Sequence, residues 1–260
     1  SKDFFFKKYG KAKAKIITSI AMFYDLENPK KFVSDIYEVL DKDGIWHFEQ
    51  SYMPTMLRMN SYDTICHEHL EYYSLLNVKS LLEGCGFKII DVTMNYINGG
   101  SFAVTACKKK SSTKSNDAVI EWLLRNENEM SLNTLKPFKL FEDRIYAHRT
   151  NLRNLIFDLI SNGKKIIGYG ASTKGNVLLQ FCKFSEKELI CMAEINQEKI
   201  GSYTPGSQIP ILSEEEAKSM NPDYMLVLPW HFKETIIRRE KKYLNNGGKL
   251  IFPLPEIEIV

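Results

Sequence analysis

Residues 164–184, KKIIGYGASTKGNVLLQFCKF, follow the pattern of a strand, a glycine-rich turn and a helix. The same alternation continues toward the end of the chain. Further strands are predicted in residues 188–195, 223–230 and 248–255, and further helices in residues 213–220 and 232–246. Regular alternation of this kind predicts a parallel sheet covered by helices, so this part of the chain has the pattern of a Rossmann-like α/β domain.

The first third of the chain also alternates strands and helices. In residues 13–23, KAKIITSIAMF, the apolar side chains form a nearly unbroken run, which predicts a buried strand of a parallel sheet. Apolar residues at a period of 3.6 predict a helix over residues 29–44, with Gly44 at its end. The next predicted elements are strand 45–52, helix 77–87, and strands 87–96 and 101–109, joined as an antiparallel hairpin by Asn98-Gly99-Gly100.

A polar break separates the two α/β regions. Residues 111–118, SSTKSNDA, have the composition of a linker, and a helical pattern extends from about residue 119 to 162. We therefore expect an α/β region at 1–110, a linker with helices at 111–163 and a second α/β domain at 164–260. No glycine-rich strand-to-helix turn precedes Lys13, so the first region is expected to be a piece of a longer domain.

The composition is that of an ordinary globular protein, with 44% apolar and 26% charged residues. The formal net charge of +3 and the lack of long basic runs do not indicate a nucleic-acid partner. No apolar run approaches the roughly 18 residues that a membrane helix needs, so no membrane partner is expected. Five cysteines without a CxxC pair predict reduced thiols in a cytoplasmic protein and no metal site within this chain.

His67-Glu68-His69 is the centre of the densest cluster of proton-transferring side chains. A zinc-protease motif would need two histidines one helical turn apart, HExxH, and this spacing does not match it. A neutral imidazole is well suited to remove a proton at neutral pH, and a neighbouring carboxylate can orient it or stabilise its charged form. The alternative is a polar surface loop. His47 is interpreted as packing, and His148 receives no role.

The turn from Gly168 to Gly175 is a candidate phosphate site, because a turn that opens a helix presents free N–H groups and the positive end of the helix dipole. Lys174 adds a positive charge, and Ser172 and Thr173 add hydroxyl donors. The turn matches neither GxGxxG nor the P-loop pattern, so a plain tight turn is the alternative. Glu194 follows about two dozen residues later, at a position suited to binding a ribose. An NAD site is therefore a second interpretation of this turn.

Two further segments are candidates for ligand contacts. Asn98-Gly99-Gly100 is either a simple hairpin turn or, beside His69, a place where a substrate approaches the backbone. Pro229-Trp230-His231 ends a predicted strand at the edge where open α/β sheets bind ligands. Trp230 either stacks on a base or caps the sheet as a core residue.

Together these motifs resemble one family, the S-adenosylmethionine-dependent C-methyltransferases that act on nucleotide-linked deoxysugars. SIAMFYDLENP (19–29), GIWHFEQSYMP (44–54), YDTICHEHLEYYS (62–74) and NGGS (98–101) resemble the second half of its methyltransferase domain. IIGYGASTKGN (166–176), TPGSQIPI (204–211) and LVLPWH (226–231) resemble its C-terminal domain. The motifs occur in the family's order along almost the whole chain.

The resemblance implies a fold and an activity. It implies the second half of a Rossmann-like methyltransferase sheet, a helical linker and a C-terminal Rossmann-like domain that lacks NAD. The family's N-terminal zinc domain and the first part of its methyltransferase domain have no counterpart here. The implied reaction transfers a methyl group from S-adenosylmethionine to a carbon beside the ketone of a nucleotide-linked 4-keto-deoxysugar, without a metal.

The resemblance also assigns residues to these roles. His69 is the implied general base and Glu68 its partner. Of the family's cofactor-facing positions, this chain contains those at the end of the first strand: Ser19, Ala21 and Met22. The implied substrate-binding residues are Asn98, Gly99, Gly100, Gly170, Ser172, Thr173, Lys174, Trp230 and His231. Two other hypotheses stay open at this point: an NAD-dependent oxidoreductase that uses the C-terminal sheet, and an inactive chain that only binds a sugar nucleotide.

Overall fold

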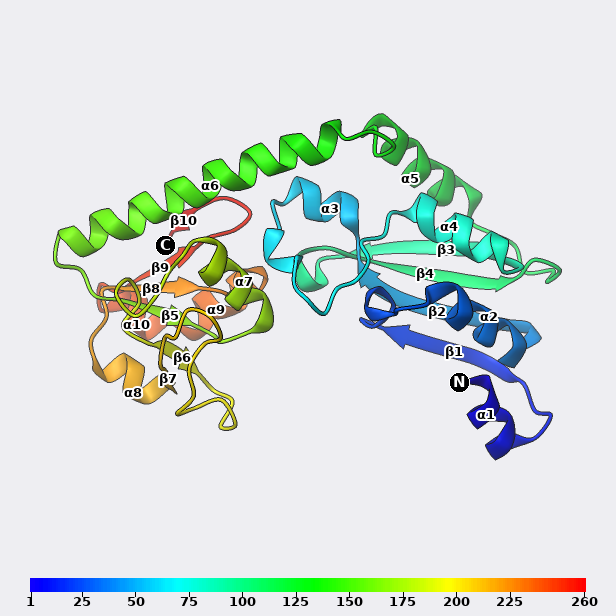
Figure 1. The fold of residues 1–260 in the computed structure, drawn as a ribbon, viewed down its shortest axis with the longest axis horizontal. Helices are drawn as coiled ribbons and strands as arrows, with labels where there is room; N and C mark the ends of the chain where they lie inside the picture. Colours follow the sequence, from blue (N-terminus) through cyan, green and yellow to red (C-terminus); the bar gives the residue numbers. More distant parts are fainter. The chain divides into compact units, whose positions relative to one another are not determined.

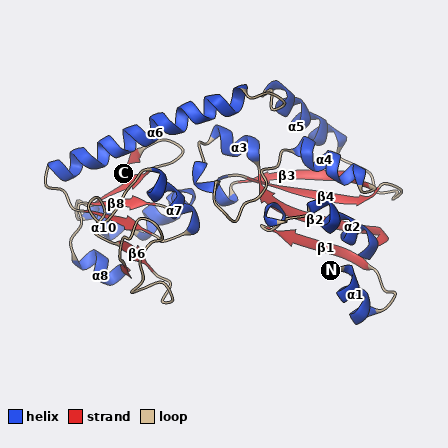
Figure 2. Cartoon of the chain, in the orientation of Figure 1, coloured by secondary structure: helices blue, strands red, loops and turns tan.

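The computed structural model describes residues 1–260, except for the side chain of Asn98. The chain forms two compact units (Figures 1 and 2). Unit 1 comprises Ser1–Leu57 and His67–Pro137, and unit 2 comprises Arg58–Cys66 and Phe138–Val260. The short segment Arg58–Cys66 therefore leaves unit 1 and packs as part of unit 2.

Unit 1 contains a four-stranded sheet in the order β1-β2-β4-β3. The strands are β1 (Ala14–Ile20), β2 (Leu40–Ser51), β3 (Phe87–Asn95) and β4 (Ser101–Lys108). β1 and β2 are parallel, and β4 pairs antiparallel with both β2 and β3. The predicted hairpin between residues 87 and 109 is confirmed, and the short 3-10 helix η3 (Ile97–Gly99) forms its tip.

Helices pack on one face of this sheet and bury an aromatic core. The helices are α1 (Lys2–Tyr9), α2 (Pro29–Val39), α3 (Met53–Arg58), α4 (Leu75–Gly84) and α5 (Asp117–Glu129). Val33 of α2, Leu82 of α4 and Leu123 of α5 belong to the core cluster around Trp46 and Phe48, whose rings stack at 4.4 Å. The side chains of β1 that point to this face are Ile17 and Ser19.

Two predictions for unit 1 are wrong in detail. β1 is not buried on both faces, because Ile16 is 66% exposed and Ile20 is 55% exposed. The helix predicted to end at Gly44 ends at Val39, and β2 begins at Leu40. Leu40 is fully buried and pairs with Ala14, so tertiary burial and strand pairing replace the last helical turn.

Unit 2 contains a six-stranded sheet in the order β10-β9-β8-β5-β6-β7. The strands are β5 (Ile166–Tyr169), β6 (Met192–Glu194), β7 (Ile211–Ser213), β8 (Tyr224–Val227), β9 (Lys249–Phe252) and β10 (Glu258–Ile259). All neighbouring pairs are parallel except the pair of β9 and β10. The strand order reverses at β5 and β8, which makes their carboxyl ends the topological switch point of a Rossmann-like sheet.

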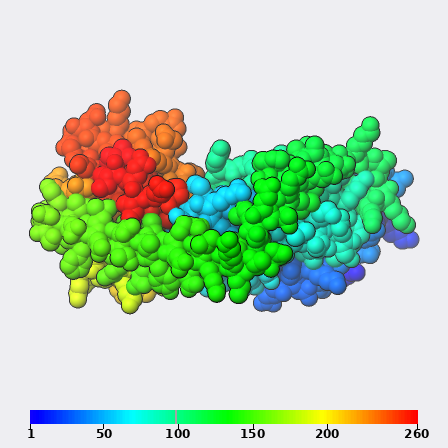
Figure 3. Space-filling model, turned by 90° about the horizontal axis from the view of Figure 1, so that it is seen from above, coloured from blue at the N-terminus to red at the C-terminus, as the bar shows by residue number. Residues whose placement is uncertain are grey.

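The helices of unit 2 include one long element and several short ones. They are α6 (Lys136–Ser161), α7 (Thr173–Phe181), α8 (Glu214–Ser219), α9 (Lys233–Arg239) and α10 (Lys241–Asn245), with the short turns η2 (Tyr62–Thr64) and η4 (Trp230–Phe232). α6 buries Phe141, Leu152 and Ile156 and leaves its other face to solvent along its length (Figure 3). α8 begins with a capping box between Ser213 and Glu216.

The structure divides the chain differently from the expected regions 1–110, 111–163 and 164–260. Ile120 of α5 belongs to the core of unit 1, whereas Phe141 of α6 is buried in unit 2. The helices expected in a linker are thus parts of the two units, because each has an apolar face to bury. The helix predicted at 232–246 is also two helices, α9 and α10, which meet at the buried Glu240.

Candidate functional site

The carboxyl end of β1 carries the predicted cofactor positions. The Ser19 hydroxyl accepts a hydrogen bond from the Trp46 indole N–H at 3.1 Å and is buried, so it serves the core. Ala21 has a positive φ of 51° and donates its N–H to the Glu49 carbonyl at 2.8 Å. A non-glycine residue in this region is strained, and such strain concentrates at ligand sites. Met22 caps the short helix η1 (Phe23–Asp25) that follows.

His69 lies against this same end of β1. The N–H groups of Leu70 and Glu71 donate to the Tyr24 carbonyl at 3.0 and 3.1 Å, which holds the catalytic-candidate loop on η1. The Tyr24 and His69 rings are 4.3 Å apart between centroids. His69 is half-buried, whereas Glu68 is exposed. The structure thus brings the predicted base next to the predicted cofactor positions within unit 1.

Asp25 is a third ionisable group in this cluster, and the sequence did not single it out. Burial raises the pKa of its carboxyl, the positive charge of His69 acts in the opposite direction, and the negative charge of Glu68 raises it again. Asp25 directly follows Tyr24, whose ring lies 4.3 Å from that of His69, so the charges of His69 and Glu68 act on its carboxyl. The cluster therefore contains two carboxyl groups and one imidazole, a set suited to proton transfer.

The hairpin tip shows a packing reason for one of its glycines. Gly100 has a φ of +126°, and a Cβ there would lie 2.2 Å from Cγ2 of Thr55. Its carbonyl accepts the N–H of Tyr52 at 3.1 Å. Gly99 also has a positive φ, of 86°, whereas the side chain of Asn98 lies outside the described residues. These contacts explain the glycine at position 100 by packing and turn geometry.

A buried polar cluster occupies the switch point of unit 2. The indole N–H of Trp230 donates to Oδ2 of Asp63 at 2.8 Å, and Oδ1 of Asp63 has no hydrogen-bond partner among the described residues. Burial raises the pKa of Asp63, although its hydrogen bond with Trp230 and the charge of Lys174 act against this. Burial lowers the pKa of Lys174, while the charges of Asp63 and Cys66 act to raise it. Lys174 is half-buried, and its charge acts on this cluster.

His231 and Trp230 are parts of the same cluster. Burial and then the charge of Lys174 lower the pKa of His231 from 6.5 to about 4. Trp230 is only 5% exposed, and its one N–H group is bonded to Asp63. These contacts favour the interpretation of Trp230 as a core residue that caps the sheet over a role in stacking on a base.

The segment Arg58–Cys66 is held in unit 2 by further contacts. The Tyr62 hydroxyl is 3.2 Å from Nδ1 of His148, whose Nε2–H donates to the Pro253 carbonyl. His148, which received no role from the sequence, is therefore a buried anchor, and burial lowers its pKa. The stretch 61–74 crosses the boundary between the units: Asp63 belongs to unit 2, and His69, six residues later, belongs to unit 1.

A pocket of about 400 Å³ opens at the carboxyl ends of β5 and β6 in unit 2, and we call it the β5–β6 pocket. Gly170 and Ser172 line it, whereas Thr173, Lys174, Trp230 and His231 are not among its lining residues. Gly170 has a φ of +82°, and a Cβ there would lie 2.9 Å from Cδ of Pro229, so only glycine fits this turn. The Ser172 hydroxyl accepts the Gly175 N–H at 3.0 Å and thereby caps α7.

Glu194 and Lys199 form one wall of the pocket. Burial acts to raise the pKa of Glu194, but hydrogen bonds from the backbone N–H groups of Asn196, Ala171 and Ile195 outweigh it, so the net shift is downward and the carboxylate is ionised. Nζ of Lys199 donates to the Ala171 carbonyl at 2.7 Å and lies 3.9 Å from the Glu194 carboxylate. The carboxylate thus fixes the shape of the turn.

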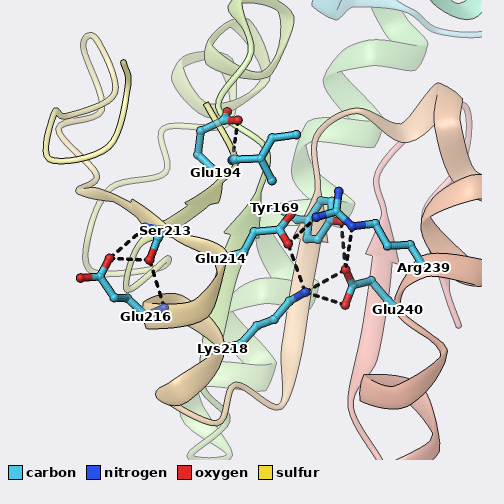
Figure 4. A network of polar contacts seen from close by, with 9 residues as sticks. Tyr169, Glu194, Ser213, Glu214, Glu216, Lys218, Arg239 and Glu240 are labelled. Carbon is cyan, nitrogen blue, oxygen red and sulfur yellow. Dashed lines mark hydrogen bonds and ion pairs between the residues drawn. The ribbon is translucent and has the colours of Figure 1, made fainter. Parts of the chain in front are cut away.

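Glu214 and Arg239 also line the pocket, and they belong to a network of charged side chains that extends away from it (Figure 4). Arg239 pairs with Glu214 at 2.5 Å, and Lys218 bridges Glu214 and the buried Glu240 at 3.3 and 2.9 Å. The Tyr169 hydroxyl donates to Glu240 at 3.0 Å. Sequence reasoning missed Lys199, Glu214 and Arg239 because they lie on different elements, far apart along the chain.

Each α/β unit has a polar cluster at the carboxyl ends of its parallel strands. This arrangement is typical of α/β enzymes that bind small molecules. The chain belongs to the family of the C-methyltransferase C-terminal domain, which matches residues 96–255. Residues 3–92 match a methyltransferase domain family. These matches confirm the predicted C-methyltransferase family. They also confirm S-adenosylmethionine as the cofactor of that family.

One relative is the C-methyltransferase NovU of Streptomyces niveus, which is 35% identical over 235 residues. The match covers 88% of this chain and 56% of NovU, so the chain spans little more than half the length of this relative.

Solved structures with a similar arrangement are distant. One is the 1,6-didemethyltoxoflavin-N1-methyltransferase of Burkholderia thailandensis with bound S-adenosylhomocysteine, with 13% identity, a TM-score of 0.31 and coverage of 39% of this chain and 46% of that one. Another is the M1.HpyAVI complex with SAM, with 15% identity, a TM-score of 0.28 and coverage of 43% and 51%. None of the described helices has the length and apolar character to cross a membrane.

Proposed function

We propose that the complete protein transfers a methyl group from S-adenosylmethionine to a carbon of a nucleotide-linked keto-deoxysugar, with His69 as general base. The family and the NovU relative support carbon as the methyl acceptor. The observation that carries the role of His69 is its position against Tyr24, directly after the strand end that presents Ala21 and Met22.

The side chains of unit 1 suit the removal of a proton beside a ketone. A half-buried imidazole can accept the proton, and the carboxyl groups of Glu68 and Asp25 can stabilise the imidazolium that forms. Glu68 is the proposed partner of the base. Asp25 is an additional candidate for this role because it directly follows Tyr24, whose ring contacts that of His69.

The cofactor would supply an electrophilic methyl group when bound. The residues of this chain that would contact it are at the end of β1, where the strained backbone of Ala21 is exposed and Met22 leads into η1. Ser19 would contribute through the backbone, since its hydroxyl is bonded to Trp46. Positioning of the two reactants would supply much of the rate enhancement.

The sugar nucleotide is proposed to bind unit 2 at the turn from Gly168 to Gly175. The first N–H groups of α7 and the positive φ of Gly170 suit a phosphate approaching the backbone. Lys174 would act from within the buried cluster, as a fixed charge beside Asp63. Gly99 and Gly100 remain candidates for contacts with the sugar.

A mass-spectrometric assay tests this proposal. The full-length protein is incubated with S-adenosylmethionine carrying a 13C-labelled methyl group and with a panel of nucleotide-linked 4-keto-6-deoxysugars. We expect one labelled methyl group on carbon in at least one product and its loss in His69→Ala. His67→Ala is the matched control, because His67 is the exposed neighbour two positions away. Full activity in His69→Ala would exclude His69 as the base.

A further inference from the structure

Glu127 places a carboxyl group in the core of unit 1. It lies on α5, which packs beside α4 (Figure 1), and only 3% of the residue is exposed. Its two oxygens accept hydrogen bonds from the Leu75 N–H at 2.5 Å, the Tyr52 hydroxyl at 2.7 Å and the Leu76 N–H at 2.9 Å. A buried carboxyl group is costly without such partners, so these bonds and the positive end of the α4 dipole offset the cost of its burial.

The start of α4 does not need a carboxyl group from another helix. Ser74 already caps this helix, because its hydroxyl accepts the Asn77 N–H at 3.3 Å. Leu76 is 54% exposed, so water can reach the first turn and satisfy an N–H group there. The bonds of Glu127 therefore have a consequence beyond capping: they tie the first turn of α4 to Tyr52, which directly follows β2.

The loop that carries His69 runs directly into this first turn. At one point the loop lies on η1, where the His69 ring is 4.3 Å from that of Tyr24. At its end Tyr73 lies on the preceding residue of η1, with its ring 5.2 Å from that of Phe23. The Tyr73 carbonyl also accepts the Met53 N–H at 3.0 Å. The place of the loop thus depends on where α4 begins, and the carboxyl group on α5 fixes that point.

Tyr52 extends the connection to the hairpin of β3 and β4. Its N–H donates to the Gly100 carbonyl at 3.1 Å, and its ring lies 4.8 Å from that of Phe102 in β4. Through this one tyrosine, Glu127 is joined to the hairpin tip as well as to the loop. A single buried group therefore links the segment that carries the candidate base with a segment that carries candidates for substrate contacts.

From these contacts we propose that Glu127 is a positioning residue for His69, which it keeps at the end of β1 by holding Leu75, Leu76 and Tyr52. The inference rests on the proposed function, because His69 is the base of that proposal. Glu127 acts through the loop and does not touch the reactants. Small displacements of a reacting group matter: a shift of about 1 Å can cost about 10²-fold in rate.

Two measurements on the full-length protein test this role. Hydrogen exchange at the Leu70 and Glu71 amides reports whether the loop stays on η1, because both N–H groups donate to the Tyr24 carbonyl. The second measurement is kcat and the KM for S-adenosylmethionine with the nucleotide-linked 4-keto-6-deoxysugars. The test variants are Glu127→Ala and Glu127→Gln. Leu123→Ala is the control for lost stability, since Leu123 is buried one turn earlier on α5 and its side chain is part of the apolar core.

In Glu127→Ala we expect the two loop amides to exchange at least about tenfold faster, because local opening of the loop becomes easier. The kcat should fall by about 10–10²-fold, with the KM for S-adenosylmethionine within about twofold of the wild type. Glu127→Gln should show smaller changes in the same direction, since its amide oxygen still accepts hydrogen bonds. Leu123→Ala should keep the wild-type kcat and loop exchange at a temperature at which it is folded.

Wild-type exchange of the loop amides in Glu127→Ala would overturn the inference, as would faster exchange with an unchanged kcat. Equal losses of kcat in Glu127→Ala and Leu123→Ala would also overturn it, because lost stability would then explain both. If Glu127→Ala does not fold, Glu127→Gln decides by the same two measurements. Full activity of His69→Ala would reject the proposed function instead, and loop exchange in the Glu127 variants would still show whether this residue holds the loop.

Discussion

The end of β1 in unit 1 and the ends of β5 and β8 in unit 2 carry similar side chains in opposite surroundings. At β1 an imidazole and two carboxyl groups, His69, Glu68 and Asp25, are exposed or half-buried. At β5 and β8 the imidazole of His231 is half-buried and the carboxyl of Asp63 is buried, and the charge of Lys174 acts on both. The difference teaches that the open cluster can exchange protons with a ligand, whereas the buried cluster holds a chain segment in place.

The two sheets also differ in how far their strands are buried. β1 has one covered face and one face on which Ile16 and Ile20 are exposed, whereas all four residues of β5 are buried. Parallel sheets normally have both faces covered by helices. Unit 2 thus shows the full burial of a doubly wound sheet, and unit 1 shows it on one face only.

The largest expected effect concerns the open cluster. His69→Ala should lower kcat by roughly 10²–10⁴-fold, the usual contribution of a general base. It should also stop the exchange of the proton beside the ketone with deuterated water, measured by NMR without S-adenosylmethionine. Unfolding by urea should be unchanged, because His69 is only half-buried. Exchange at the wild-type rate in this variant would contradict the role of the open cluster.

The buried cluster should respond in stability. Asp63→Ala removes the partner of the Trp230 indole N–H and the charge beside Lys174, and we expect a loss of about 1–3 kcal/mol in the free energy of unfolding. Asp63→Asn should cost less, because its amide oxygen can still accept from Trp230. Asp25→Ala in unit 1 is the control, with a change within about 0.5 kcal/mol. Urea titrations compare the three variants, and equal losses for Asp63→Ala and Asp25→Ala would remove the distinction between the clusters.

The half-buried imidazole of His231 should contribute to the pH dependence of stability. Because the pKa of His231 is lowered to about 4, the unfolded chain takes up this proton at a higher pH than the folded chain. The contribution of His231 to stability is therefore complete above pH 6.5 and is lost as the pH falls from 6.5 to about 4. His231→Gln should flatten this part of the curve, measured by urea unfolding at several pH values. An identical slope in the variant would show that His231 titrates normally.

The smallest effect is expected on the exposed face of β1. Ile16→Thr and Ile20→Thr should change the free energy of unfolding by no more than about 0.5 kcal/mol, because both side chains are largely exposed already. Ile167→Ala in β5, which is fully buried, should cost about 2–5 kcal/mol. Thermal unfolding of the three variants measures this contrast. A large loss for Ile16→Thr would mean that this face is covered in the protein as it exists.

The sequence predicted the local elements that depend on neighbours along the chain. The strand, turn and helix at residues 166–181 and the hairpin at 87–108 follow from apolar patterns and glycine-rich turns, and both are confirmed. The helix end at Gly44 was wrong because Leu40 gains more from burial and from pairing with Ala14 than from another helical turn. The roles of His69 and Glu68 remain predictions that the position of His69 supports.

By itself the sequence determined the α/β class and the family, and it predicted the stretch 61–74 as a site of chemistry, because these depend on patterns and motifs that are continuous in the chain. Only the tertiary structure decided that this stretch is divided, with Asp63 buried in unit 2 and His69 held against Tyr24 in unit 1. It also decided that Glu194, Glu214 and Arg239 line one pocket. Burial and long-range pairing bring such residues together, and neither is written in the spacing of residues along the chain.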